Sequence, residues 1–389
     1  MSNKVKKREQ QYFDYGLLAI IIFLVSFGLV MLYSTSSYSA LEKFNNSSYF
    51  FNKQVKAAVI GFIGMMIVSV FPVKLYAKLS KLAYFASFFI MALVWTPIGV
   101  EAYGARRWIS IPLFGTMQPA ELTKLAVIIF IPVLICKVGK RIREPKEFFT
   151  ILAWGGAAAA GVLFITDNLS SAVIVMGIVC IMVFVAHPRT APFIGIVGAG
   201  GAAVLVGVRI LDKMMETSSD FRLRRILVWL HPEEYASEGG FQTMQGLYAI
   251  GSGGFFGKGL GNSAQKMVIP EVQNDMILSI ICEELGVCGA IVLFTLFGML
   301  LYRLMFIAQN APDMYSSLIV TGIFGHIALQ VILNVCVVLN VIPTTGISLP
   351  FISYGGTALV ISMAELGIAL GISRKISLDE PEEVQKIKN

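Results

Sequence analysis

One stretch, residues 268–278, decides how this chain is organised, and it reads VIPEVQNDMIL. A polar segment carrying Glu271 and Asp275 ends here, and a long apolar run begins immediately after it. The apolar run has the length of a membrane-spanning helix, so Asp275 is expected at a boundary between water and membrane. A carboxylate held at the entry of a helix is the strongest candidate for chemistry in this chain.

The composition around this stretch is that of a membrane protein. The chain has 389 residues, of which 56% are hydrophobic and 14% are charged, and its mean hydropathy is +0.74. Long, continuous apolar runs predict an all-α polytopic membrane protein, whereas a β-barrel would show short alternating segments. The net charge of +7 comes from basic residues beside apolar runs, where they orient helices, so we expect no nucleic-acid partner.

The apolar runs predict ten transmembrane helices. Their approximate ranges are 15–33, 54–71, 82–100, 120–136, 148–166, 169–186, 191–211, 276–307, 314–341 and 357–373. Basic residues in the short loops place both termini in the cytoplasm. The chain therefore divides into a basic cytoplasmic N-terminus (1–14), a membrane domain (15–373) and a cytoplasmic tail (374–389). The membrane domain includes a long extracytoplasmic loop, 212–275, between helices 7 and 8.

This topology places Asp275 and several cations at the outer face. The outward cations are Arg106, Arg107, Arg222, Arg224, Arg225, Lys258 and Lys266. Each could be an ordinary solvated loop residue, but a ligand carrying a phosphate or pyrophosphate would explain the group.

Polar residues also lie inside the predicted spans. Glu121 and Lys124 are three residues apart and share a helix face, either as a stabilising ion pair or as part of a polar, outward cavity. A stripe at a spacing of four residues, His326, Gln330 and Asn334, predicts hydrogen bonds between helices. Glu365 in the last span requires a partner or a water-filled pocket.

Four motifs carry a resemblance to a known family. They are GISLPFISYGGTA at 346–358, GARRWI at 104–109, QPAE at 118–121 and EELG at 283–286. In combination they resemble the shape, elongation, division and sporulation (SEDS) family over about residues 15–375. The stretches GGFQ (239–242) and GLGNSAQK (259–266) are most similar to the division and sporulation members.

The resemblance implies a ten-helix peptidoglycan glycosyltransferase that polymerises lipid II on the outer face of the cytoplasmic membrane. Asp275 matches the essential aspartate of the family and would act as a general base on a sugar hydroxyl. The sequence departs from the family pattern nearby, where Gln273 and Asn274 replace His and Thr, and where Thr345 replaces a common Lys. The candidate substrate-binding residues are Arg106, Arg107, Glu121, Lys124, Lys258, Ser353, Gly355 and Gly356.

The sequence identifies no certain cofactor, and a divalent cation is the one candidate. The leaving group of the implied reaction is a lipid pyrophosphate, which Arg, Lys or a divalent cation (Mg²⁺ or Mn²⁺) can neutralise, and the sequence assigns no metal ligands. The implied partners are lipid II, the nascent glycan strand, a class B penicillin-binding protein transpeptidase and other division proteins. The reaction would release undecaprenyl diphosphate, and a division role would concentrate the protein at the septum.

Two other functions remain open from the residues alone. The intramembrane Glu121, Lys124, His326 and Glu365 motivate a flippase or transporter of lipid-linked precursors. The departures at Gln273 and Asn274 motivate a non-catalytic scaffold of a division or spore complex.

Overall fold

The structure is a computed structural model that describes residues 12–102, 105–111, 115–189, 193, 195, 221–235 and 240–376. Within this part of the chain, nine helices are long and apolar enough to cross a membrane. They are α1 (Tyr15–Phe44), α2 (Tyr49–Val70), α3 (Val73–Ala92), α4 (Pro119–Val138), α5 (Pro145–Ile165), α6 (Leu169–Ala186), α10 (Ile277–Gln309), α11 (Met314–Val338) and α12 (Gly356–Ser373). The predicted seventh span, 191–211, lies outside the described residues apart from two positions.

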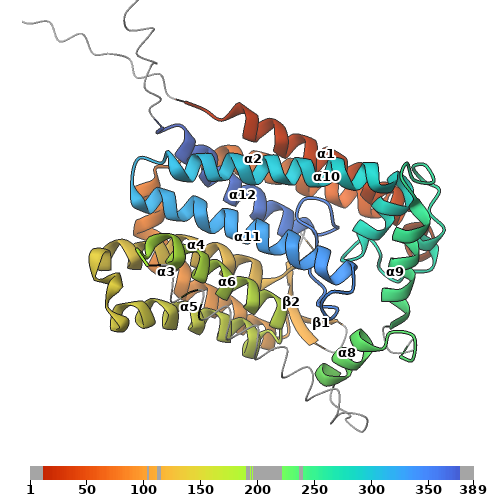
Figure 1. Cartoon of the computed structure of the whole chain (residues 1–389), viewed down its shortest axis with the longest axis horizontal. Helices are drawn as coiled ribbons and strands as arrows, with labels where there is room; N and C mark the ends of the chain where they lie inside the picture. Colours follow the sequence, from red (N-terminus) through yellow and green to blue (C-terminus); the bar gives the residue numbers. More distant parts are fainter. Residues whose placement is uncertain are drawn as a thin grey trace, which may run out of the picture.

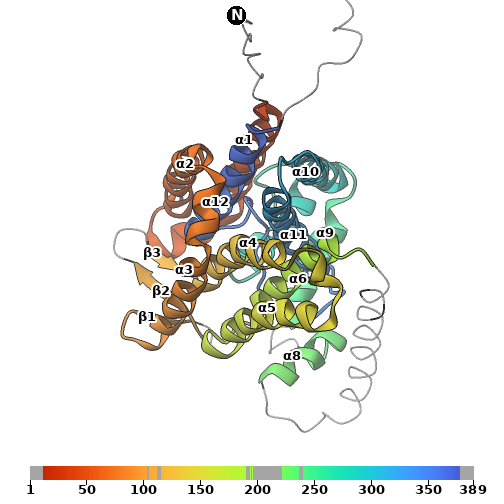
Figure 2. The ribbon, with the colours of Figure 1, turned by 90° about the vertical axis from the view of Figure 1, so that its left-hand side faces the viewer.

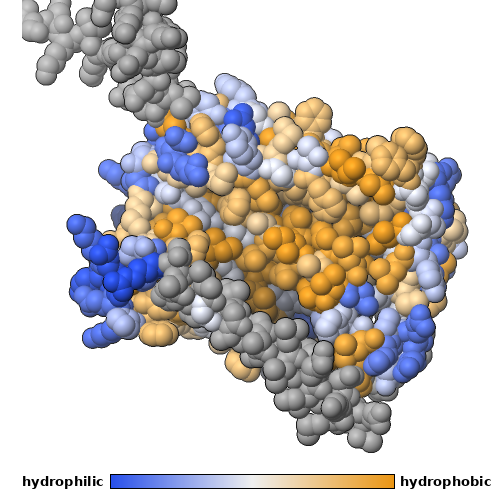
Figure 3. Space-filling model, viewed as in Figure 1, coloured by the Kyte–Doolittle hydropathy of each residue, from blue (hydrophilic) through white to orange (hydrophobic). Residues whose placement is uncertain are grey.

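The long helices run roughly side by side and form one bundle (Figure 1). On the face drawn in Figure 3, hydrophobic side chains form a central band, and hydrophilic residues gather at both ends of the bundle. An apolar band flanked by two polar ends is the surface that a lipid bilayer requires. The prediction of a predominantly helical membrane protein is therefore confirmed in its coarse form.

The centre of the bundle is made by α4, α11 and α12. Of the most apolar stretches of α11 and α12, 72% of residues are buried, against 28% for α10. Viewed along the helices, α4 and α11 lie in the middle, and α12 packs closely on α2 (Figure 2). Side chains that reach the interior come mainly from these helices, so polar residues on them must find partners within the protein.

Both described ends of the chain lie at one end of the bundle. The backbone N–H of Asp14 donates to Ser373 Oγ at 3.3 Å, and the Arg374 guanidinium lies 4.9 Å from the centre of the Phe13 ring. The Asp14 side chain caps α1 by accepting from the N–H of Leu17 at 2.8 Å. The start of α1 and the end of α12 are thereby joined.

The first helix is longer than predicted. The sequence suggested a loop at 34–53, but α1 continues to Phe44. The hydroxyl groups of Thr35, Ser36, Ser37 and Ser39 donate to carbonyls three or four residues earlier, as Thr35 does to Met31 at 2.9 Å and Ser36 to Leu32 at 2.6 Å. These local bonds satisfy the hydroxyls without leaving the helix, so a polar stretch that resembled a loop stays helical.

The expectation of a purely helical chain was wrong in the segment between α3 and α4. A single turn, η1 (Leu93–Trp95), is followed by a small antiparallel sheet of β1 (Gly99–Ala102), β2 (Ala105–Ile111) and β3 (Gly115–Met117). These strands are too short to show a clear alternation in the sequence. The Thr357 hydroxyl donates to the Thr116 carbonyl at 3.1 Å, which joins the sheet to the first turn of α12.

The described parts of the long hydrophilic segment before Asp275 also contain regular structure. It contains α8 (Phe221–Leu230), α9 (Gly240–Gly253) and the short turn η4 (Gln265–Met267). The other short turn, η2 (Gly139–Arg143), connects α4 to α5 at the opposite end of the bundle. Helix α9 packs on α10, because its glycines and Thr243 present a flat, buried face. Tertiary packing thus supplies stability that the composition of the segment did not suggest.

Helix α10 is broken at Gly286. This residue has φ 67° and ψ −163°, which interrupts the helix two turns after its start. That region of backbone space is essentially reserved for glycine. A Cβ on Gly286 would lie 2.4 Å from the backbone nitrogen of Gly257. The absence of a side chain at residue 286 therefore allows the backbone around Gly257 to pack directly against the break.

Replacement of Gly286 with alanine should therefore destabilise the protein by at least about 1–3 kcal/mol, from backbone strain alone. The measurement is the midpoint of thermal unfolding in detergent. Gly298 is the matched control, since it lies in the same helix and a Cβ added there would meet no atom within 4 Å. Gly298→Ala should leave the midpoint unchanged or raise it, because alanine is the better helix former. An unchanged midpoint for Gly286→Ala would contradict the break.

Candidate functional site

Asp275 lies at the meeting point of three segments. It stands two residues before the start of α10. The side-chain amide of Asn334, on α11, donates to the Asp275 carbonyl at 2.9 Å and to the Ile347 carbonyl at 2.7 Å. The side-chain amide of Gln242, on α9, donates to Asp275 Oδ1 at 3.3 Å. Helix α11 therefore holds the backbone of Asp275, and α9 contacts its partly exposed carboxylate.

Gln242 is a site residue that sequence reasoning did not single out. The GGFQ stretch served only as a mark of family similarity, and no spacing rule connects residue 242 to residue 275. Only the packing of α9 on α10 brings the amide to the carboxylate. An amide N–H can donate to a carboxylate, so Gln242 helps to orient the Asp275 side chain.

The loop at 343–355 is fastened to the segment that carries Asp275. The backbone N–H of Tyr354 donates to the Gln273 carbonyl at 2.9 Å. Gln54, on α2, donates to the Ser353 carbonyl at 3.3 Å and accepts from the Gly355 N–H at 3.2 Å. This arrangement brings the predicted residues Ser353, Gly355 and Gly356 beside the Asp275 segment.

Two side chains in this loop have internal roles. The buried Ser353 hydroxyl accepts from the Leu349 N–H at 2.8 Å. Burial raises the pKa of Tyr354 to about 12, so its phenol is uncharged at neutral pH. The Tyr354 ring meets Phe50 edge to face, with centroids 5.0 Å apart. These contacts make the loop a rigid wall beside the site.

The polar stripe on α11 forms hydrogen bonds between elements, as the sequence predicted. His326 Nδ1 lies 2.7 Å from Glu365 Oε2 on α12, which identifies the partner that Glu365 required. Gln330 donates to the Ser348 carbonyl at 3.1 Å, and Asn334 completes the stripe at Asp275. One face of α11 thus joins α12, the 343–355 loop and the candidate site.

The predicted cation sites differ in accessibility. Arg106 is half exposed and forms an ion pair with Glu101 at 3.3 Å. Arg107 follows it on β2 and is partly buried.

Lys124 and Glu121 form a buried ion pair of 2.7 Å in the first turns of α4. Lys258 lies 2.7 Å from Glu283 Oε1, and its side chain is 38% exposed, so its charge is already balanced within the protein. The side chains of Arg222, Arg224 and Arg225 lie outside the described part of the structure.

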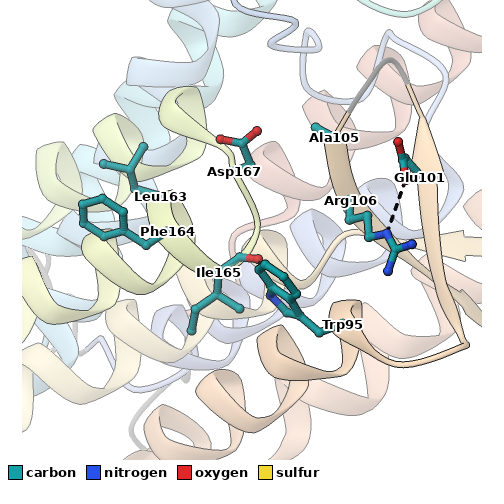
Figure 4. A pocket seen from close by; sticks show the side chains of 8 residues that line it. All are labelled: Trp95, Glu101, Ala105, Arg106, Leu163, Phe164, Ile165 and Asp167. Carbon is teal, nitrogen blue, oxygen red and sulfur yellow. Dashed lines mark hydrogen bonds and ion pairs between the residues drawn. The ribbon is translucent and has the colours of Figure 1, made fainter.

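A cavity of about 360 Å³ opens between the β1–β2 hairpin and the turn from α5 to α6 (Figure 4). Its apolar wall includes Trp95 and Phe164, and its charged side includes Glu101, Arg106 and Asp167. Of the residues predicted to bind substrate, Arg106 lines this cavity. The Trp95 N–H donates to the Ile165 carbonyl at 2.9 Å, which fixes the indole at the edge of the cavity.

No group of three or more His, Cys, Asp or Glu side chains is placed to hold a metal ion in the part of the chain that the structure describes.

The comparisons with known proteins agree with one another. Stage V sporulation protein E of Bacillus subtilis is 37% identical over 365 residues, covering 93% of this chain and 97% of that protein. A probable peptidoglycan glycosyltransferase FtsW of Trichlorobacter lovleyi is 36% identical over 368 residues, covering 94% of each.

Two solved structures share the fold. One chain, from a study of the structural coordination of polymerization and crosslinking by a peptidoglycan synthase complex, has a TM-score of 0.75 and 28% identity, covering 94% of this chain and 99% of that one. The rod shape determining protein RodA of Thermus thermophilus has a TM-score of 0.66 and 26% identity, covering 94% and 98%. The model of the FtsW, RodA and SpoVE cell cycle proteins matches residues 15–378, and this chain belongs to that family, the SEDS proteins.

Proposed function

We propose that this protein is a peptidoglycan glycosyltransferase that polymerises lipid II on the outer face of the cytoplasmic membrane. The observation that carries the proposal is the position of Asp275, whose backbone carbonyl is held just before α10 by Asn334 and whose carboxylate accepts from Gln242. The names of the relatives, a sporulation protein and probable peptidoglycan glycosyltransferases, support the same activity.

In the proposed mechanism, Asp275 is the general base. Its carboxylate accepts the proton of the 4-hydroxyl group of the acceptor sugar, while that oxygen forms a bond to the anomeric carbon of the donor. The bond between the anomeric carbon and the pyrophosphate oxygen breaks, and the lipid pyrophosphate leaves as undecaprenyl diphosphate. The carbonyl of Asp275 is held by Asn334, so the base approaches the hydroxyl from a defined position.

The cations would act on the substrate in different ways. The half-exposed Arg106 is available to the pyrophosphate once it exchanges Glu101 for the ligand. Lys258 is neutralised by Glu283, so it would hold the segment beside the site rather than present a free charge to the substrate. Glu121 and Lys124 are buried together in the first turns of α4, so they would stabilise that end of the helix rather than present a free charge. Ser353, Gly355 and Gly356 would shape the wall through the backbone contacts of their loop.

We assign ten membrane spans to the protein, with both termini in the cytoplasm. The contact between Asp14 and Ser373 supports an even number of crossings. Helix α6 starts beside Thr345, whose carbonyl accepts from Ser170 at 2.7 Å, and α8 touches the same end through Trp229 and Asn340. Helices α6 and α8 therefore both contact the same end of the bundle, which agrees with the proposed span at 191–211.

The remaining assignments follow from this topology. Residues 1–14 and 374–389 form the cytoplasmic ends, and the loop 212–275 faces outward from a membrane domain of residues 15–373. A class B penicillin-binding protein transpeptidase is the proposed partner, by likeness to the chain from a peptidoglycan synthase complex. Together with other division proteins it would place the enzyme at the septum.

The direct test is polymerisation of fluorescent lipid II by the purified protein in detergent or liposomes. Glycan strands that lysozyme digests are the expected product, separated by gel electrophoresis. Parallel reactions with EDTA, Mg²⁺ or Mn²⁺ determine whether a cation is required. A protein that moves labelled lipid II across liposomes and forms no polymer would instead be a transporter. The pairing of the buried charges, Glu121 with Lys124 and His326 with Glu365, does not favour that function.

Replacement of Gln242 with leucine should reduce the polymerisation rate by roughly tenfold, because one hydrogen bond to a charged group is lost. The effect should appear in kcat, because the amide contacts the base and not the lipid. Gln245, one turn along the same helix, is the control, and Gln245→Leu should retain the wild-type rate. Equal rates for the wild type and Gln242→Leu would remove Gln242 from the site.

A further inference from the structure

Two adjacent glutamates of α10 lie on the inside of the protein, just ahead of the break at Gly286. Both Glu283 and Glu284 have fully buried side chains. A buried carboxylate is costly unless donors surround it. Here the donors come from the glycine-rich segment 252–266 and from α1.

Glu283 gathers donors from the glycine-rich segment. Its Oε1 accepts from Lys258 Nζ at 2.7 Å and from the Ala264 N–H at 3.3 Å. Its Oε2 accepts from the Ser263 hydroxyl and from the Gln265 N–H at 3.3 Å. A carboxylate that accepts from four groups in a segment of eight residues fixes the conformation of that segment.

Glu284 joins the same segment to α1. Its Oε1 accepts from Lys266 Nζ at 3.1 Å and from the Ser263 N–H at 3.4 Å. The Ser34 hydroxyl of α1 lies 2.8 Å from Oε1 and 2.6 Å from Oε2. The two glutamates and the two lysines carry equal and opposite charge, so the cluster is locally neutral. We call Glu283, Glu284, Lys258, Ser263 and Lys266 the glutamate clamp.

The break in α10 adds main-chain contacts to the clamp. The N–H groups of Lys258 and Gly259 donate to the carbonyls of Glu283 and Glu284, each at 2.9 Å. On the far side of Gly286, the N–H groups of Val287 and Cys288 donate to the carbonyls of Gly254 and Phe255, at 3.1 and 3.0 Å. The interrupted helix therefore pairs with the glycine-rich segment on both sides of the break.

The clamp closes the loop that contains Asp275. The chain leaves the clamp at Lys266, passes through Asp275 and returns to the clamp at Glu283. Within this loop, Ile269 donates to the Gln265 carbonyl at 2.9 Å, and Glu271 forms an ion pair with Lys43 of α1 at 3.3 Å. A short loop whose two ends are fastened has far fewer conformations than an open one.

We propose that Glu283 and Glu284 are positioning residues, which hold the 267–276 loop in the one conformation that presents Asp275 to substrate. The inference rests on the proposed function for its catalytic part. Glutamine is the appropriate probe, since it keeps the size of the side chain but places an NH₂ group where the surrounding groups also donate. At least one donor at each glutamate then loses its acceptor.

Hydrogen exchange of the detergent-solubilised full chain tests the clamp without reference to activity. In Glu283→Gln and Glu284→Gln, amide hydrogen exchange at 263–266 and 269–275 should be about 10- to 100-fold faster than in the wild type, because hydrogen bonds to a charged group are lost. Glu147→Gln is the control, because this α5 residue pairs with Arg141 at the other end of the bundle. Unchanged exchange at 269–275 in both variants would overturn the proposal.

Steady-state polymerisation of lipid II then tests the link to Asp275. Both variants should lose about tenfold or more in kcat and keep KM within about twofold, since the base is misplaced while the lipid contacts remain. Increased KM with unchanged kcat would overturn the positioning role. If the wild type forms no polymer, the proposed function fails, and the exchange at 269–275 still decides whether the clamp orders that loop.

Discussion

Asp275→Asn should lower the rate of lipid II polymerisation by roughly 10²- to 10⁴-fold, the contribution of a positioned general base. Asparagine has nearly the same shape as aspartate but cannot accept a proton at neutral pH. The bond from Asn334 goes to the backbone carbonyl, so the substitution should leave the surrounding fold in place. The loss should therefore appear in kcat, while the unfolding midpoint and the affinity for lipid II remain close to those of the wild type.

The neighbouring carboxylate supplies the control for this experiment. Glu271 lies four residues earlier in the same loop and pairs with Lys43 at the surface. Glu271→Gln removes the same charge from the same region, yet an exposed ion pair contributes only about 0–1 kcal/mol. It should retain most of the activity. If Asp275→Asn polymerises lipid II at the wild-type rate, or if both variants lose activity equally, Asp275 is not the base.

His326→Leu should cause a larger loss of stability than any of the other substitutions proposed for this protein. His326 and Glu365 are 1% and 0% exposed, and their side chains lie 2.7 Å apart in the middle of the bundle. Removal of the histidine leaves a buried carboxylate without its partner, which costs about 3–5 kcal/mol when such pairs are broken. The measurement is thermal unfolding in detergent, followed by tryptophan fluorescence or by loss of the monodisperse peak.

The double variant separates this cost from simple loss of packing. In His326→Leu with Glu365→Met, neither polar side chain of this pair remains, and replacement of a complete buried pair by apolar side chains is often nearly neutral. The unfolding midpoint should therefore recover most of the loss. A double variant less stable than both single variants would show that the pair contributes through shape rather than through charge. If the double variant still polymerises lipid II, neither His326 nor Glu365 is required for the reaction.

The candidate site could be predicted from the sequence only where a residue has a clear local signal. Asp275 stands at the junction of a polar segment and an apolar run, which one sequence suffices to show. The stripe of His326, Gln330 and Asn334 follows from the period of a helix. Gln242 and Glu284 could not be identified in this way, because their partners lie 33 and 250 residues away along the chain.

The amino-acid sequence was sufficient for the class of the protein, most of its spans and the placement of Asp275 at the start of a helix. These features depend on hydropathy and on the local period of the chain, which act over about 20 residues. Four features needed the folded chain: α1 continues past Ser34, β1, β2 and β3 form a sheet, α10 breaks at Gly286, and Glu283 and Glu284 bind the glycine-rich segment. Each of these depends on a partner distant in sequence, or on a residue whose local preference is weak. Burial in the bundle determines these features, because a polar group inside the bundle must form its hydrogen bonds with the polar groups that the tertiary structure places next to it.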